Sequence, residues 1–572
     1  MSTAATAPAA AKRPAGALSE WLAARGGIVM LFAALLVFLT LPLAMLFVRS
    51  MQDKTGAGVG FDNFVGYLTS PAFARSAGNT LTFAGLTTVL TVPLAFGFAY
   101  AIQRSCIPFK VLWRNIALIP ILAPSMLAAL SFIYLFGNQG ALKFVLGWFG
   151  VATVYGLPGM VLAMIFASFP HAVMILLASL ALSDARLYEA ADSLATPEWR
   201  KFTTITLPGA RYGLISATMV VFTMAVSEFG VPKVIGGNYS VLAIDIYKQV
   251  VGQQNFNIGA VVGLVLLVPA VIAYAIDRSV QRRQQALVTA RSVLYQPRPV
   301  GARDRSMLVF VIIVSAVMLV VMGMAAYGSL VRVWPYNLSL TLNHYIYAFE
   351  DGGVDRSYRN SMVMALWCGV LGAAVTFAGA YWLEKTRGGD AFRPLIRAQA
   401  MMPMAVPGLV LGIGYILFFN HPDNPLNFLY GTMTILVAST IVHFYSSSHL
   451  TAVTALKALD GEFESVSASL KVPFYKTFWR VTVPVCLPTV IDVGRYYFVN
   501  AMTTISAVVF LYAPKTTLVS ISIVKLDEAG SVGPAAAVAT LIVATSAVVT
   551  VASLAAEGWL LRRTQAWRRA AQ

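Results

Sequence analysis

The chain has 572 residues, of which 58% are hydrophobic and only 11% are charged. This apolar share exceeds that of soluble globular domains, so the composition predicts an integral membrane protein. The net charge of +17 does not indicate a nucleic-acid-binding protein, because the basic residues lie in short stretches beside apolar segments. The cysteines Cys106, Cys368 and Cys486 are too scattered to predict a disulfide framework, and no metal-ligand spacing occurs.

The N-terminal region contains a short polar stretch followed by a long apolar one. Met1 to Gly16 is rich in Ala and Pro and is predicted to lack regular structure. Gly27 to Val48 is long enough to span a bilayer and too long for the core of a signal peptide. It also lacks a clear small-residue cleavage site, so it is interpreted as a retained first helix.

About twelve apolar segments are long enough to cross a bilayer, and they form two groups of six. The first group covers residues 27–49, 79–102, 113–136, 157–181, 211–230 and 258–277. The second covers residues 307–330, 360–384, 396–419, 433–456, 486–511 and 534–556. An even number of segments in each group predicts parallel repeats related by an axis along the membrane normal. The fold prediction is therefore an all-α integral membrane protein with two parallel six-helix repeats.

The predicted domains follow this division. They are a tail at residues 1–26, a first domain at 27–277, a basic linker at 278–306, a second domain at 307–556 and a basic tail at 557–572. Matching residues in the two halves support the repeat; they are Asn79 and Asn360, Tyr100 and Tyr381, Pro120 and Pro403, and Pro124 and Pro407.

A polar loop follows the fourth apolar segment of each half, and the two loops are similar. The first runs from Ser183 to Pro208, and the second runs from Leu459 to Pro484, about 276 positions later. The matched pairs are Asp184 and Asp460, Ser193 and Ser469, Leu194 and Leu470, Pro197 and Pro473, Phe202 and Phe478, Thr206 and Thr482, and Pro208 and Pro484. A loop that is duplicated inside a duplicated scaffold indicates a shared function rather than a plain solvated connector.

Each loop is predicted to contain two short helices. In the first loop, Asp184 or Ser183 can cap a helix over Ala185–Ala195, which is rich in Ala and Leu. Pro197 suits the first turn of a second helix, with Thr196 as its cap. Pro208 then marks the start of the next apolar segment.

The residues of the first loop carry a family resemblance. Its pattern is similar to the EAA loop in the membrane subunits of binding-protein-dependent ATP-binding cassette (ABC) importers of the maltose and methionine type. That pattern is Glu-Ala-Ala, three variable residues, Gly, and later Ile-x-Leu-Pro; the matching residues are Glu189, Ala190, Ala191, Ile205, Leu207 and Pro208. Ala195 stands where Gly is usual. In the second loop Ser465 occupies the Glu position, Glu464 precedes it, and Lys471 replaces the Gly.

The resemblance implies partner subunits. The chain has no Gly-x-x-x-x-Gly-Lys-Ser/Thr loop and no cofactor motif, so it is not expected to be an enzyme, and ATP hydrolysis is expected in a separate subunit. Two loops imply two copies of that ATPase, and the family implies a periplasmic substrate-binding protein. Ala190 and Ala191 would offer a small-residue surface to the ATPase. Glu189 would form an ion pair or cap at the contact; the alternative is a solvated helix charge.

Basic residues predict the orientation of the chain in a bacterial inner membrane. The side expected to face the cytoplasm carries Arg104, Lys110, Arg114, Arg186, Arg200, Lys201 and Arg211, linker arginines 278, 282, 283, 291, 298, 303 and 305, and tail arginines 562, 563, 568 and 569. The opposite loops hold far fewer, such as Lys54, Arg75 and Lys143. Both termini and both polar loops are therefore predicted to be cytoplasmic.

The segment after each polar loop is expected to line the translocation path. In the first half it ends at Ser227-Glu228-Phe229-Gly230, which resembles the acidic-Phe-Gly ending of the family. The predicted path residues are Ser227, Glu228, Thr503, Thr504 and Ser506; Glu228 could instead lie at the periplasmic rim. Asp492 and Arg495, three residues apart, are expected to pair on one helix face.

The cargo prediction rests on resemblance. Fused double-permease chains of this length resemble ferric-iron permeases and 2-aminoethylphosphonate permeases, and Met502 to Ala537 is more similar to the phosphonate group. The predicted function is thus the permease of an ABC importer for 2-aminoethylphosphonate or another phosphonate, with ferric iron as the alternative. A secondary transporter of two six-helix halves is a rival class, but it would not require two polar loops. An intramembrane enzyme is disfavoured because no nucleophile–base arrangement is found.

Overall fold

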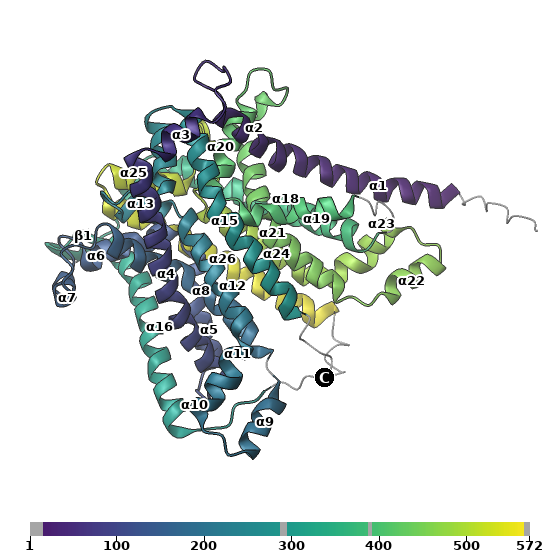
Figure 1. Cartoon of the computed structure of the whole chain (residues 1–572), viewed down its shortest axis with the longest axis horizontal. Helices are drawn as coiled ribbons and strands as arrows, with labels where there is room; N and C mark the ends of the chain where they lie inside the picture. The colour runs from purple at the N-terminus through teal and green to yellow at the C-terminus, as the bar shows by residue number, and fades with distance from the viewer. Residues whose placement is uncertain (1–14, 183, 286–294, 387–391, 565–572) are drawn as a thin grey trace, which may run out of the picture.

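The computed structural model describes residues 15–182, 184–285, 295–386 and 392–564. Within these ranges the chain is almost entirely helical, and it has one two-stranded antiparallel hairpin, β1 and β2 (Figure 1). Most of the predicted N-terminal tail, Ser183 and the basic residues Arg291, Arg568 and Arg569 lie outside the described residues.

The elements of the first half include one long helix for each straight span and several short helices between them. They are α1 (Ala15–Leu35), η1 (Leu36–Thr40), α2 (Leu41–Ser50), α3 (Asp62–Leu68), α4 (Pro71–Arg104), α5 (Lys110–Leu118), η2 (Ile119–Leu122), α6 (Ser125–Phe136), α7 (Lys143–Trp148), α8 (Leu157–Ala181), α9 (Ala185–Ser193), α10 (Glu198–Lys201), η3 (Phe202–Thr206), α11 (Leu207–Gly209), α12 (Arg211–Ser227), α13 (Gly230–Ile235), α14 (Leu242–Tyr247), η4 (Lys248–Gly252) and α15 (Phe256–Gln285).

The second half repeats this order. Its elements are α16 (Gly301–Leu330), β1 (Val331–Val333), β2 (Asn337–Leu340), α17 (Asn343–Glu350), α18 (Val354–Glu384), α19 (Arg393–Met401), η5 (Met402–Ala405), α20 (Gly408–Phe419), η6 (Asn427–Leu429), α21 (Met433–Lys457), α22 (Glu462–Ser469), α23 (Phe474–Thr477), η7 (Phe478–Thr482), α24 (Val483–Thr503), η8 (Pro514–Thr516), α25 (Val519–Glu528) and α26 (Val532–Thr564).

The number of membrane spans is lower than the expected twelve when length and hydropathy are applied to these helices. Among the described residues, seven helices are long and apolar enough to cross a membrane, and the number rises to ten if each of three bent helix pairs is one span. The remaining two expected segments coincide with α21 and α24, which do not meet these criteria. Each expected segment thus corresponds to a helix or a bent pair, but several are not straight apolar rods.

Two of the bends occur at matching prolines. The segment formed by α5 and η2 meets α6 at 100° around Pro124, and the segment formed by α19 and η5 meets α20 at 113° around Pro407. Pro has no backbone N–H for a helical bond and disfavours the helical conformation in the residue before it. Accordingly, Ala123 and Val406 are extended, with φ of −102° in both. The repeated prolines therefore break the third predicted segment of each half.

Hydrogen bonds confirm that the halves are structural repeats. The Asn79 side chain donates through Nδ2 to the Ser240 carbonyl at 2.8 Å, and Asn360 donates in the same way to the Thr517 carbonyl at 3.0 Å. In each half the bond joins the long second helix, α4 or α18, to the segment before α14 or α25. The matched asparagines found in the sequence therefore have the same structural role.

The first helix of each half packs against the other half. Tyr415 of α20 donates its hydroxyl to the Phe38 carbonyl of η1 at 2.6 Å. A Cβ on Gly414 would lie 2.8 Å from the Pro42 carbonyl oxygen, so only Gly allows this approach of α20 to α2. In the reciprocal contact, Gly328 of α16 lies against the ring of Tyr134 in α6. Each half therefore supplies a helix to the surface of its neighbour.

Candidate functional site

The two polar loops begin with the same helix cap. The Asp184 carboxylate accepts a hydrogen bond from the Arg186 backbone N–H at 3.1 Å, where α9 starts. In the second loop the Asp460 carboxylate accepts from the Glu462 N–H, also at 3.1 Å. A side-chain acceptor satisfies one of the free N–H groups at a helix start. The structure therefore confirms the Asp184 cap and shows its counterpart in the second loop.

The end of each first loop helix has an unusual backbone conformation. Ala195 and Lys471 both have a φ of +51°, in the left-handed region. The next residue of each loop donates its N–H to a carbonyl five residues earlier: Thr196 to Ala191 at 2.9 Å and Val472 to Ser467 at 2.8 Å. Gly is favoured after a helix because it adopts this conformation without steric cost. This is the physical reason that the family pattern has Gly here, and this chain retains the turn without it.

The second helix of the first loop, α10, starts one residue later than the sequence predicts. Pro197, with φ −65° and ψ 150°, occupies the cap position of α10, so the cap is not Thr196. Pro473 has the same place before α23. The fixed φ of Pro is compatible with an extended cap residue as well as with the first helical turn. The loop then continues through η3 and α11 and bends by 61° into α12.

Exposed apolar side chains lie at matched positions of the two loops. We define the first loop patch as Leu187, Leu194 and Trp199, and the second loop patch as Phe463, Leu470 and Tyr475, each about 276 positions from its counterpart. Leu194 is 80% exposed and Leu470 is 70% exposed. Leu194 and Leu470 are already matched in the sequence, whereas the pairs Leu187 with Phe463 and Trp199 with Tyr475, and the exposure of all six side chains, emerge only from the structure. Their signal is apolar character retained at equivalent positions of both polar loops.

The EAA residues of the first loop differ in exposure. Ala191 is 8% exposed and packs inward, whereas Glu189 and Ala190 face outward. Within the described part of the chain, no ion pair involves Glu189. Of the small-residue surface expected at Ala190 and Ala191, only Ala190 is exposed. Most of the exposed apolar surface of this loop therefore belongs to the first loop patch.

Each loop is held to its half by a basic residue at the end of the long second helix. The Arg104 guanidinium lies 5.3 Å from the centre of the Tyr188 ring and donates to the Leu180 carbonyl at 2.7 Å. In the second half Lys385 forms an ion pair with Glu464 at 3.1 Å. Glu464 therefore occupies the place of Tyr188, and it is directed to the protein rather than to the outer surface of the loop.

The first loop also contains an ion cluster centred on Lys201. Its ammonium lies 2.5 Å from the Asp192 carboxylate and 2.8 Å from that of Glu198. Hydrogen bonding to Lys201 lowers the pKa of Asp192, and the hydrogen bonds to Asp192 and Glu198 raise the pKa of Lys201. Since Asp192 and Glu198 are accessible to solvent, these pairs orient the loop more than they stabilise the fold.

The predicted path residues lie at helix breaks. Glu228 directly follows α12, and its Oε1 accepts hydrogen bonds from the Ser125 hydroxyl at 2.7 Å and from the Val231 N–H at 3.1 Å. It thus links the break before α13 to the start of α6. Thr504 directly follows α24 in the same way, with a ψ of 141° against 130° for Glu228.

The hydroxyl side chains near these breaks form local bonds. Ser227 donates to the Thr223 carbonyl at 2.8 Å, and Thr503 donates to the Val499 carbonyl at 3.1 Å. Ser506 lies against the start of α20, where a Cβ on Gly408 would meet its Oγ at 2.3 Å. The path prediction for these residues stays a prediction.

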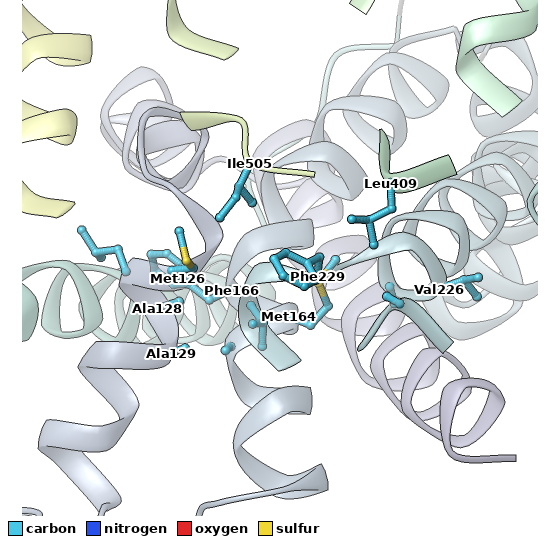
Figure 2. Close-up of a cluster of buried hydrophobic side chains, with 14 of the residues drawn as sticks. Met126, Ala128, Ala129, Met164, Phe166, Val226, Phe229, Leu409 and Ile505 are labelled. Carbon is cyan, nitrogen blue, oxygen red and sulfur yellow. The ribbon is translucent and has the colours of Figure 1, made fainter. Parts of the chain in front are cut away.

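Apolar side chains gather beside the helix breaks. Figure 2 shows Met126 and Phe229 of the first half in one buried cluster with Leu409 and Ile505 of the second half. Phe229 follows Glu228, and Ile505 follows Thr504, so the two halves contribute residues at equivalent positions. In this conformation the region next to the predicted path is therefore occupied by apolar contacts between and within the halves.

A charged contact also joins the halves. Lys233 of α13 forms an ion pair with Glu528 of α25 at 2.5 Å and lies 4.7 Å from the centre of the Tyr247 ring. Tyr247 in turn stacks on Phe510 of the second half, with ring centres 6.4 Å apart.

The expected pair of Asp492 and Arg495 is confirmed. In the described ranges no group of three or more His, Cys, Asp or Glu residues could hold a metal ion.

A protein-family comparison explains the repeat. The family described as "Binding-protein-dependent transport system inner membrane component" matches residues 93–286 and residues 369–564, which together form more than half of the chain. The chain belongs to this family. Its two matched regions identify a fused double-domain permease of a type I binding-protein-dependent ABC importer and a multi-pass inner-membrane protein.

Relatives of this permease differ in length and name. It is 26% identical over 558 residues to the ferric transport system permease protein FbpB of Actinobacillus pleuropneumoniae, which covers 94% of this chain and 78% of the relative. It is 23% identical over 266 residues to the sulfate transport system permease protein CysW of Synechococcus elongatus, covering 45% of this chain and 90% of the relative.

A comparison with solved structures also gives a match over part of the permease. The matched structure is a bacterial alginate ABC transporter in complex with an alginate pentasaccharide-bound periplasmic protein, with 20% identity and a TM-score of 0.39. The match covers 48% of this chain and 98% of the other.

Proposed function

We propose that the permease forms the translocation path of an ABC importer and that its two polar loops dock two copies of a separate ATPase subunit. The supporting observation is the pair of loop patches, which expose apolar side chains at matched positions. Exposed apolar patches rimmed by polar residues are typical of protein–protein contacts. A periplasmic binding protein would deliver the cargo to the opposite side.

The geometry suggests how the loops act on the path. The first loop continues through η3 and α11 into α12, and Glu228 directly follows α12, next to the apolar cluster. The second loop continues through η7 into α24, which Thr504 directly follows. A displacement of either loop by an ATPase would therefore move a helix whose far end contacts the cluster. Separation of the cluster would open the path.

We propose ferric iron as the leading cargo, because the FbpB relative covers 94% of this chain and is named for ferric transport. The phosphonate suggested by Met502 to Ala537 is the second candidate. It is favoured by the CysW relative, which is named for transport of another oxyanion but matches only 45% of this chain. Cargo selection would rest largely with the periplasmic binding protein.

A growth experiment separates the two cargoes. A strain that lacks the permease gene, and has no redundant importer, is expected to grow poorly under iron limitation and normally on 2-aminoethylphosphonate as sole phosphorus source. Supplying the wild-type permease should restore both growth and uptake of radioactive iron. A defect confined to 2-aminoethylphosphonate would instead favour the phosphonate assignment, and normal growth in both media would contradict both.

We also propose the orientation and the domain limits given by the sequence. Residues 27–277 and 307–556 form the two permease domains, with both termini, the linker at 278–306 and both loops in the cytoplasm. The density of basic residues on that side supports this orientation.

Cys106 provides a test of the orientation. It is exposed and lies between Arg104 and Lys110, in the turn between α4 and α5. A membrane-impermeant thiol reagent is expected to leave Cys106 unmodified in intact cells and to modify it in inverted vesicles. Cys368 and Cys486 are buried, so a Cys106→Ser variant gives the background. Modification of Cys106 from outside intact cells would reverse the orientation.

A further inference from the structure

A cavity lies between the first polar loop and the linker. Its volume is about 280 Å³, and residues of α4, the loop, the linker and α16 line it. Its charged lining consists of Arg104, Lys201, Arg298, Arg303, Asp192 and Glu198. Lys201 and Arg298 pair with Asp192, Lys201 also pairs with Glu198, and Arg303 pairs with the neighbouring Asp304, so Arg104 is the cation of this lining without a carboxylate partner among the described residues.

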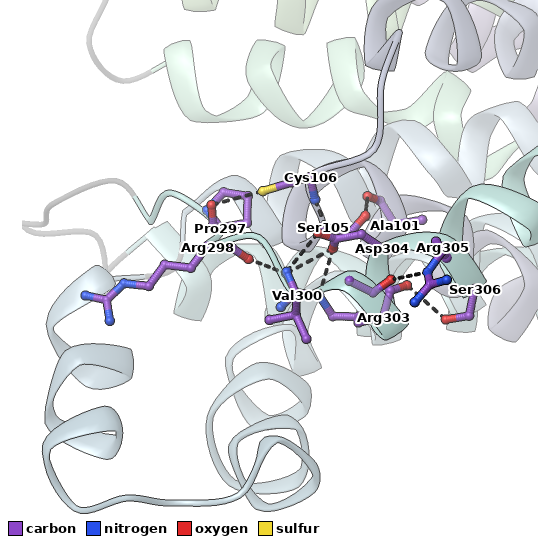
Figure 3. Close-up of polar contacts among 11 residues, drawn as sticks. Ala101, Ser105, Cys106, Pro297, Arg298, Val300, Arg303, Asp304, Arg305 and Ser306 are labelled. Atoms are coloured by element: carbon purple, nitrogen blue, oxygen red, sulfur yellow. Dashed lines mark hydrogen bonds and ion pairs between the residues drawn. The ribbon is translucent and has the colours of Figure 1, made fainter.

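The linker wall of this cavity is fixed by hydrogen bonds. Figure 3 shows Asp304 accepting from the Cys106 N–H at 3.1 Å and from the Val300 N–H at 2.9 Å. The Cys106 thiol donates to the Pro297 carbonyl at 3.2 Å. Arg298 reaches the loop, where it lies 3.3 Å from Asp192. The cavity is therefore bounded by two segments that are already in contact.

Arg104 is the deepest cation of the lining. It is 3% exposed, and its Nε is buried without a hydrogen-bond partner in the described chain. Its guanidinium lies 4.6 Å from the centre of the Tyr295 ring and 5.3 Å from that of Tyr188. No carboxylate pairs with it among the described residues. A buried cation without an anionic partner is energetically costly.

The second half shows what this position accepts. Lys385, at the same place as Arg104 in the repeat, pairs with the carboxylate of Glu464 at 3.1 Å. The residue that corresponds to Glu464 in the first loop is Tyr188, which carries no charge. The second half thus supplies a carboxylate to Lys385, whereas the first half has no equivalent carboxylate for Arg104. The cavity lies beside Tyr188, where that carboxylate would be.

We propose that this cavity binds a small oxyanion of the phosphate class. Its charge would compensate that of the unpaired Arg104, and guanidinium groups bind phosphate oxygens through strong charge-assisted hydrogen bonds. The ligand would contact Arg104 of the first half and Arg298 of the linker together. Binding would then hold the linker against the first loop and leave the second loop unaffected.

The proposal is tested on the full-length permease purified in lipid nanodiscs. Inorganic phosphate, titrated against chloride at constant ionic strength, is expected to bind once per chain and to raise the unfolding temperature. Arg298→Gln should weaken phosphate binding about tenfold, since it removes a charge-assisted contact from a solvent-exposed side chain that is not required for folding. Arg332→Gln, at the distant hairpin, is the matched control and should bind like the wild type.

A second variant uses the internal repeat. Tyr188→Glu supplies the carboxylate of the second half, so it should fold and lose the phosphate effect, whereas Tyr188→Phe should retain it. The proposal is overturned if phosphate and chloride act equally, or if Arg298→Gln and Tyr188→Glu both bind phosphate as the wild type does. The measurement involves neither cargo nor ATPase, so its failure would leave the proposed transport function intact.

Discussion

A permease that carries both Leu194→Asp and Leu470→Asp is expected to lose its ATPase subunits during purification while remaining folded in the membrane. Both leucines are among the most exposed apolar residues of the loops, so their replacement should change the stability of the permease by less than about 0.5 kcal/mol. At a docking contact, by contrast, the loss of a buried apolar anchor costs about 2 to 4 kcal/mol, or a factor of roughly 30 to 1,000 in affinity.

Copurification of the ATPase and transport-coupled ATP hydrolysis measure this effect. Each single variant should retain one contact and bind the ATPase more weakly than the wild type. The matched control is Phe428→Asp, which changes an equally exposed apolar residue of η6 away from the loops. Full recovery of both ATPase copies with the double variant would show that the loop patches are not the docking surface.

The second large effect is expected from Glu464→Lys. From its position in the sequence pattern, Glu464 resembles a displaced EAA glutamate, and its substitution would be milder than Glu189→Lys. The ion pair between Glu464 and Lys385 leads us to expect the opposite order for the stability of the permease. Lys385 has a side chain that is only 11% exposed, and it would lose its anionic partner and face a second cation. Removing one member of a partly buried pair typically costs a few kcal/mol, on the order of 1 to 3 here.

The expected result is a lower unfolding temperature together with a weakened second loop contact, whereas Glu189→Lys should leave the unfolding temperature unchanged. Combining Glu464→Lys with Lys385→Glu restores opposite charges and should recover most of the loss. If Glu464→Lys is as stable as the wild type, or if the charge exchange gives no recovery, Lys385 does not anchor the second loop.

The sequence predicted the architecture well because it carries the same information twice. The duplicated loop, the matched asparagines and the matched prolines each appear in both halves, and the apolar segments are long. The helix breaks were harder to predict. Prolines at 124 and 407 were recognised as matched, but an apolar segment interrupted by Pro does not reveal whether it continues straight or turns by 100°.

The loop details depended on contacts between residues that are distant in the chain. Glu464 faces inward because Lys385, in another helix, attracts it, and no local pattern contains that information. The left-handed turn at Ala195 was also hidden, because the Gly that would normally mark it is absent. The pair Leu194 and Leu470 is visible in the sequence as a matched apolar position, but its exposure on the loop surface is visible only in the structure.

The exchange of first helices between the halves has a consequence for biosynthesis. The partner of η1 and α2 is α20, which includes Tyr415 and Gly414, and ribosomes complete it several hundred residues later. During that interval the newly inserted first helix has only lipid and its own half as neighbours. The Phe38 carbonyl, which later accepts the Tyr415 hydroxyl, and the surface at Pro42, which later packs against Gly414, are therefore without these partners until α20 is inserted. Premature termination in the second half would leave this helix without its partner and expose it to membrane quality control.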